Sequence, residues 1–264
     1  MSGERALVVG ESEWAEAVAA FLRPSGWPIA THVLEPADRA WAETQVGRDL
    51  LAEALAPLAA EATVAVDALL WPFERKRALV EVLDGVLPAA AALATWCSAQ
   101  STTEIASWVR HPRRVVGYSL LPPLDLVRLV EIAPGLDTAP AAVEAVERLF
   151  AAAGHETARV RDDAGLVAAR IVCLIINEAA AMVQEGVAAP RDIDTALKLG
   201  ANYPRGPLEW ADLMGIDTVY AVLAGLLAEQ QEDRYRPCPL LRKMVLAGRL
   251  GRKSGRGFFE YPAG

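Results

Sequence analysis

The segment from Arg114 to Glu131 contains the residues whose types could move a proton. It reads RVVGYSLLPPLDLVRLVE and includes Tyr118, Ser119 and a terminal carboxylate, Glu131. A general base needs a pKa near neutrality and hydrogen-bond reach to its proton, and a serine hydroxyl without a base of its own has neither. The phenol of Tyr118 ordinarily titrates near ~10, and its neighbour on a strand points to the opposite face. The segment therefore predicts a polar site without an evident proton acceptor.

A second group of residues could hold a phosphate. Ala6 to Gly10 is a short apolar run that ends in glycine and leads into helical spacing, which predicts a strand, a tight turn and a helix. The dinucleotide fingerprint GxGxxG belongs at such a turn, and its three positions fall here on Gly10, Ser12 and Ala15. Alanine is tolerable at the third position, but Ser12 places a side chain where the pyrophosphate should pass. Acidic neighbours on both sides of Ser12 add repulsion, so the sequence predicts a weakened phosphate site.

Composition excludes several classes of protein. The net charge of -8 and pI near 5.1 argue against nucleic-acid binding, which depends on clustered Lys and Arg. No basic leader and no run of ~18 apolar residues is present, so we expect a cytoplasmic protein without a membrane span. The three cysteines are odd in number and widely spaced, which predicts neither a disulfide framework nor a metal site.

The elements that must position these residues divide into two parts. Strands alternating with helices over residues 1–161 predict a Rossmann-like, doubly wound, mostly parallel sheet of the α/β class. Residues 162–264 lack strand patterns and predict an all-α domain. Its first helix, from Leu166 onward, is apolar nearly all round in its first half, as expected when other helices or a second subunit cover it. We therefore expect an all-α dimerisation domain at the carboxyl end.

An ordered set of motifs lies in this second part: an asparagine-containing apolar helix, a GANYPRGPLEWAD turn and a terminal GRKSGRGFFEY tail. The set closely resembles the C-terminal domain of the L-3-hydroxyacyl-CoA dehydrogenase (3-hydroxybutyryl-CoA dehydrogenase) family. A single glycine motif is weak, but several linked motifs in one order are not. The resemblance implies an oxidoreductase of fatty acyl-CoA metabolism that uses NAD, binds an acyl-CoA-type small molecule and forms a homodimer.

The resemblance also implies roles for four positions. The family's catalytic histidine falls on Ser119, and the glutamate that orients this histidine falls on Glu131. Ser98 matches the serine that contacts the substrate hydroxyl, whereas the asparagine of the apolar helix falls on Ala169. Ser119 and Ala169 depart from the family pattern, and His32, His111 and His155 all lie outside the segment. Glu131 without a histidine could equally form an ordinary ion pair with Arg128 or Arg170.

The residues at the family's cofactor-binding positions also differ from the family pattern. The acid that binds the adenosine ribose falls on Val33, and Trp71 takes the place of an acidic residue near the nicotinamide ribose, while Lys76 matches the family. Trp96 occupies an asparagine position, and we expect Trp71 and Trp96 to narrow the nicotinamide cleft. Together with Gly10, Ser12 and Ala15, these residues form a degenerate NAD site.

Three hypotheses follow from this pattern. The first is a family member that has lost most of its NAD-dependent oxidation and keeps an acyl-CoA-binding or partner role. The second is an active NAD-dependent 3-hydroxyacyl-CoA dehydrogenase with an altered site, and the third is a non-enzymatic structural interaction protein. NADH formation separates the second from the others, and acyl-CoA binding separates the first from the third.

Overall fold

The protein consists of two compact units. The computed structural model describes residues 3–35, 40–70 and 72–261, and within these it leaves the side chains of residues 12, 13 and 40 undescribed. Residues Met1–Leu120 and Leu124–Leu166 belong to the first unit, and Leu121–Pro123 and Val167–Gly264 belong to the second.

A seven-stranded sheet forms the centre of the first unit, in the order β2-β1-β3-β4-β5-β6-β7. All neighbouring strands are parallel except β5 and β6, which are antiparallel. The strands are β1 (Ala6–Glu11), β2 (Ile29–Leu34), β3 (Val64–Asp67), β4 (Ala92–Trp96), β5 (Val115–Ser119), β6 (Leu129–Pro134) and β7 (Glu156–Arg159). The predicted Rossmann-like, mostly parallel sheet is confirmed.

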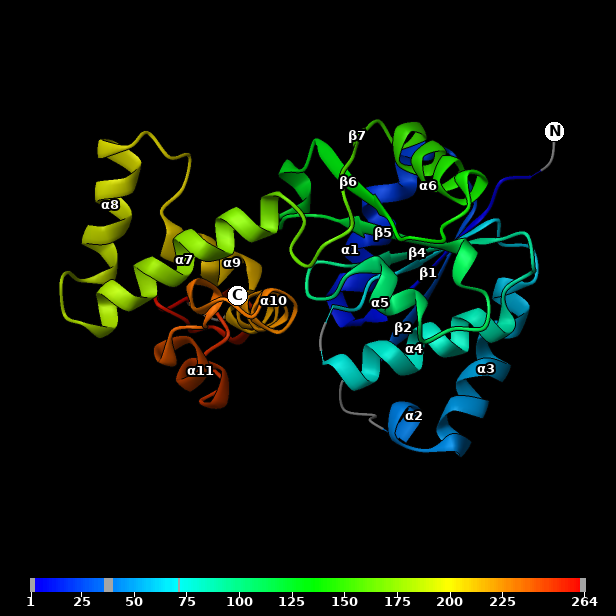
Figure 1. The fold of residues 1–264 in the computed structure, drawn as a ribbon, viewed down its shortest axis with the longest axis horizontal. Coiled ribbons are helices and arrows are strands. Elements are labelled where there is room, and N and C mark those ends of the chain that lie inside the picture. Colours follow the sequence, from blue (N-terminus) through cyan, green and yellow to red (C-terminus); the bar gives the residue numbers. More distant parts are fainter. Residues whose placement is uncertain (1–2, 36–39, 71, 262–264) are drawn as a thin grey trace. The chain divides into compact units, whose positions relative to one another are not determined.

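Helices cover both faces of this sheet (Figure 1). On one face lie α1 (Ser12–Leu22) and α6 (Pro140–Ala152), whose rings Phe21 and Phe150 pack with centroids 6.4 Å apart. On the other face α3 (Gln45–Ala59) and α4 (Phe73–Val86) bury leucines against the strands. Two shorter helices complete the unit, α2 (Ala40–Glu43) and α5 (Thr102–Ala106). The central strands are therefore buried on both faces, which explains their continuous apolar runs.

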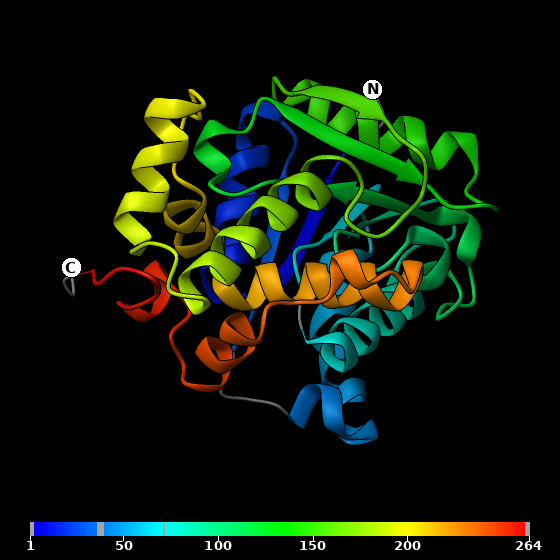
Figure 2. The same cartoon turned by 60° about the vertical axis from the view of Figure 1, so that its left-hand side comes forward.

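The second unit is built from helices alone among its regular elements. They are α7 (Ala168–Gln184), α8 (Pro190–Gly200), α9 (Pro207–Met214), α10 (Ile216–Gln230) and α11 (Pro239–Leu246). Three of them begin with proline at the first position, where a missing N–H costs no hydrogen bond. The apolar helix α7 contacts α9, α10 and α11 (Figure 2). The predicted all-α carboxyl-terminal fold is confirmed.

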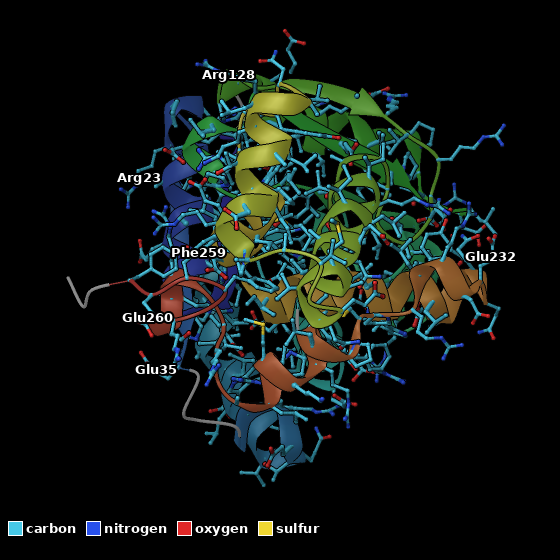
Figure 3. All side chains as sticks on the ribbon, turned by 90° about the vertical axis from the view of Figure 1, so that its left-hand side faces the viewer. Arg23, Glu35, Arg128, Glu232, Phe259 and Glu260 are labelled. Atoms are coloured by element: carbon cyan, nitrogen blue, oxygen red, sulfur yellow. The ribbon has the colours of Figure 1, made fainter. Side chains whose placement is uncertain are left out.

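The glycine-rich motifs of the second unit serve its structure. Asp194 accepts the N–H groups of Leu208 and Glu209 at 2.8 Å each, which caps the amino end of α9. Asp212 accepts the N–H groups of Phe258 and Phe259 at 2.9 Å each and thereby fixes the terminal tail, on which Figure 3 labels Phe259. Burial raises the pKa of both aspartates while these hydrogen bonds oppose the shift. The motifs that carry the family resemblance thus hold the helical unit together.

Among the described helices, none alone has the length and apolar composition of a membrane span. The pair α9 and α10 meets that test only when joined, and the two helices are bent by 97° at their junction.

Candidate functional site

The direction in which the chain adds strands reverses at one point of the sheet. The chain leaves β1 for β2 on one side and returns to β3 on the other, so the carboxyl ends of β1 and β3 form the switch point at which open α/β sheets bind ligands. Gly10 lies at this point, and a Cβ there would stand 2.9 Å from the Cβ and the carbonyl oxygen of Ala68. Only glycine fits beside Ala68, so this fingerprint position keeps its packing role.

Three of the predicted catalytic positions lie together, two at the carboxyl ends of β4 and β5 and one near the start of β6. The hydroxyls of Ser98 and Ser119 are hydrogen-bonded at 2.8 Å, and both residues are buried. Ser119 stands directly opposite Glu131 in the antiparallel ladder of β5 and β6. The fourth position, Ala169, is buried in α7 of the helical unit. The α/β unit therefore brings Ser98, Ser119 and Glu131 together, as a substrate-contacting serine, a base position and an orienting carboxylate would require.

Trp96 contacts the serine pair, and Trp14 and Tyr118 pack against the Trp96 ring. The Trp96 indole N–H donates to the Ser98 hydroxyl at 3.0 Å, and its ring packs edge-on to Trp14 with centroids 5.5 Å apart. Tyr118 is fully buried and donates its hydroxyl to the carbonyl of Asp67 at 2.9 Å. Burial, with a smaller contribution from the Asp67 charge, raises the pKa of the Tyr118 phenol well above its usual value. Tyr118 is therefore not a proton acceptor near neutral pH.

The three histidines lie elsewhere in the α/β unit. His111 contacts the buried carboxylate of Asp84 at 3.2 Å, and His155 stacks on Phe21 with ring centroids 3.6 Å apart. His32 is on β2, where burial lowers its pKa. None has a described contact with Ser98 or Ser119, so the described residues supply no imidazole to the serine pair.

A buried ion pair lies at the end of β3. The Lys76 ammonium and an Asp67 carboxylate oxygen are 2.5 Å apart, and neither side chain is exposed. Lys76 also donates to the Leu69 carbonyl, and the same Asp67 oxygen accepts the Thr95 hydroxyl at 2.7 Å. The structure therefore places Lys76, a predicted cofactor contact, in an internal ion pair.

The first unit is a doubly wound sheet with polar residues at the carboxyl ends of its strands, and a helical unit follows it. This is the architecture of two-domain nicotinamide-dependent dehydrogenases. The particular family follows from two matches to family models. Residues 37–163 match the NAD binding domain of 3-hydroxyacyl-CoA dehydrogenase, and residues 165–261 match its C-terminal domain. The chain belongs to the 3-hydroxyacyl-CoA dehydrogenase family, and NAD is the cofactor that this membership supports.

Curated relatives agree with this family. A probable 3-hydroxybutyryl-CoA dehydrogenase of Bacillus subtilis is 39% identical over 203 residues, which cover 77% of this chain and 71% of the relative. The 3-hydroxybutyryl-CoA dehydrogenase of Bradyrhizobium diazoefficiens is 38% identical over 216 residues, covering 82% and 73%.

Solved structures share the fold. M. tuberculosis FadB2 superimposes with a TM-score of 0.80 at 28% identity, over 99% of this chain and all of that one. The (S)-3-hydroxybutyryl-CoA dehydrogenase of Ralstonia eutropha gives a TM-score of 0.73 at 29% identity, over 98% of this chain and all of that one.

The fit of the dinucleotide can be judged from the first βα turn, which precedes the matched residues. Ala15 is fully buried, as close helix packing requires. However, the carboxylate of Glu11, the last residue of β1, lies 2.6 Å from the Arg75 guanidinium at the switch point. A carboxylate there repels a pyrophosphate, and Val33, half-buried on β2, cannot accept a ribose hydroxyl. Glu11 and Val33 therefore both weaken the site that this turn offers to NAD.

Two predicted cofactor positions lie outside the described part of the chain. Trp71 is one, and the side chain of Ser12 is the other. Trp96 is described, and it is buried against Tyr118 with ring centroids 6.2 Å apart. Glu35, two residues beyond Val33, is exposed after the end of β2 (Figure 3).

Sequence reasoning missed two residues at the switch point, Arg75 and Asp67. Arg75 lies in the polar run FERKR at the start of α4, which has the composition of a solvated helix face. Asp67 ends a buried strand, and a carboxylate at such a position is a signal that could have indicated a paired lysine.

Proposed function

We propose that this chain is a 3-hydroxyacyl-CoA dehydrogenase-family protein that binds an acyl-CoA-type ligand and has much reduced NAD-dependent oxidation. The observation that carries the proposal is Ser119 at the base position, hydrogen-bonded to Ser98 and opposite Glu131 in the ladder. Removing the proton of a 3-hydroxyl requires an acceptor, and a positioned one typically contributes ~10²–10⁴-fold. Ser98 keeps a serine at the family's substrate-contacting position, so binding can persist where oxidation is slow.

A second candidate is an active dehydrogenase with an altered site. It is favoured by the relatives, which are named as 3-hydroxybutyryl-CoA dehydrogenases at 38–39% identity. Such an enzyme would need a proton acceptor from a water molecule or from the ligand, since burial raises the pKa of the Tyr118 phenol and keeps it protonated near neutral pH.

The wild-type protein is expected to bind 3-hydroxybutyryl-CoA but to form NADH at least ~100-fold more slowly than a relative with the histidine, because the base is missing. Calorimetry measures the binding, and absorbance at the NADH band measures the oxidation. The B. subtilis relative, assayed under the same conditions, is the reference. Saturable oxidation at the rate of the relative would establish the second candidate. Absence of both binding and oxidation would favour the structural interaction protein instead.

The same proposal includes a homodimer formed through α7 and residues beside it. Ile171 on α7 is 54% exposed, and it lines an apolar cavity of about 230 Å³ within the helical unit. The other lining residues are Val172, Ile175, Ile176, Tyr203, Pro204, Arg205, Pro207 and Trp210. An exposed apolar surface of this kind is typical of a protein interface.

Ile171→Glu is expected to convert the dimer to a monomer, because a charge at the interface would be buried without a partner. Light scattering at micromolar concentration measures the change. Leu136→Glu is the matched control, since Leu136 is 88% exposed on the α/β unit and should leave the mass unchanged. A wild-type protein that is already a monomer would contradict this part of the proposal.

A further inference from the structure

Two groups that attract anions meet at the switch point. The first is the amino end of α1, an 11-residue helix that starts directly after Glu11. Its first N–H groups and its dipole favour a negative charge there. The second is Arg75 in the first turn of α4, the helix that follows β3. Since α1 follows β1 and α4 follows β3, these groups belong to the two halves that border the switch point.

Among the described residues, Arg75 has partners for only part of its guanidinium. It is 9% exposed, its Nη1 lies 2.6 Å from Glu11, and its charged centre lies 5.1 Å from the ring centroid of Trp41. The Nε and Nη2 donors of Arg75 are buried and have no hydrogen-bond partner among the described residues, and the same holds for the indole N–H of Trp41. Buried donors left without an acceptor destabilise a fold. Two such donors on one guanidinium, beside a third on Trp41, point to an oxyanion ligand that the described residues do not supply.

The geometry of the guanidinium suits a phosphate. Nε and Nη2 lie on one edge of the planar group, and this edge is the one that binds two oxygens of a phosphate or carboxylate at once. The Glu11 carboxylate engages the other end at Nη1. Its negative charge neutralises Arg75 and opposes an incoming phosphate at the point where the fingerprint turn would hold one.

We propose that Arg75 is the phosphate receptor of this chain for an adenine nucleotide and that Glu11 is an internal competitor for it. In the usual fingerprint, the second glycine lets the backbone approach the phosphate closely. Here the Arg75 guanidinium takes the place of that backbone contact. Glu11 is then one cause of the weakened dinucleotide site, beside Val33. The inference rests on the family's use of NAD and does not depend on the base at Ser119.

The test is ADP binding measured by calorimetry, with adenosine as the probe that lacks phosphate. Glu11→Gln keeps the length of the side chain and removes its charge, so ADP should bind about tenfold tighter or more, the size expected for one charge-assisted hydrogen bond gained. Adenosine should bind equally to both proteins. Adding Arg75→Met to Glu11→Gln should abolish the gain.

Two control variants remove a carboxylate from α1 and a guanidinium from α4 at exposed positions away from the Glu11–Arg75 pair. Glu16→Gln removes an exposed carboxylate of α1 that pairs with Arg23, and Arg77→Met removes an exposed guanidinium of α4 that pairs with Glu81. Neither should change the affinity for ADP. Thermal melting verifies that each variant is folded, and Glu11→Ser is the second variant if Glu11→Gln is not.

Folded Glu11 variants that bind ADP no tighter than wild type would overturn the proposal, as would a tighter affinity that survives Arg75→Met. Neither result bears on NADH formation. The proposed loss of oxidation and the proposed role of Arg75 can therefore be refuted independently, the first by NADH formation and the second by ADP binding.

Discussion

Restoring the base and the cofactor site together is expected to raise oxidation of 3-hydroxybutyryl-CoA by about 100-fold or more. The variant combines Ser119→His and Ala169→Asn with Ser12→Gly and Val33→Asp. Ser119 stands opposite Glu131 in the ladder, so an imidazole there would have the orienting carboxylate beside it. A positioned base contributes typically ~10²–10⁴-fold, and the two changes in the first βα unit supply the glycine and the ribose acid that the fingerprint requires.

The pair Ser119→His and Ala169→Asn without the cofactor changes should remain slow, because a base multiplies only the fraction of protein that carries cofactor. Steady-state kinetics over a range of NAD concentrations distinguish the variants. Ser119→Ala is the matched control, and it should leave the residual rate unchanged if the serine is no base. Robust, saturable oxidation by Ser119→His alone at ordinary NAD concentrations would mean that the cofactor site is sound and that our interpretation of the first βα turn is wrong.

The fold could be predicted from local patterns because the strands and helices alternate with clear periods. β1, β3 and β4 are mostly apolar, and the segment that holds the glycine-rich motifs matches the family's C-terminal domain. These signals lie within a few residues of one another. The sequence therefore contains what is needed for element type and order.

The site was only partly predictable because its contacts join distant segments. Ser98 and Ser119 were identified by position, and the structure brings their hydroxyls within 2.8 Å. The pairing of Glu11 with Arg75 depends on two strands lying next to each other, and a charged run at the start of α4 gives no sign of burial. Lys76 in the same run was predicted to contact the cofactor, whereas its position in the fold leaves it no exposure.

Lys76→Met is expected to destabilise the α/β unit by about 3–5 kcal/mol, the usual effect of removing one partner of a buried ion pair. The substitution keeps the length of the side chain but leaves the Asp67 carboxylate buried, with the Thr95 hydroxyl and the Leu69 N–H as its donors among the described residues. The free energy of unfolding, measured in urea by tryptophan fluorescence, tests this value.

The double variant Asp67→Asn, Lys76→Met should lose less stability than Lys76→Met alone, because no uncompensated charge is then buried. Arg77→Met is the control on the same helix, where the exposed pair with Glu81 should be worth at most about 1 kcal/mol. If Lys76 were instead a cofactor contact, Lys76→Met would leave the unfolding free energy unchanged and weaken NAD binding. A stability loss that Asp67→Asn relieves would show that Lys76 stabilises the end of β3 through its ion pair with Asp67.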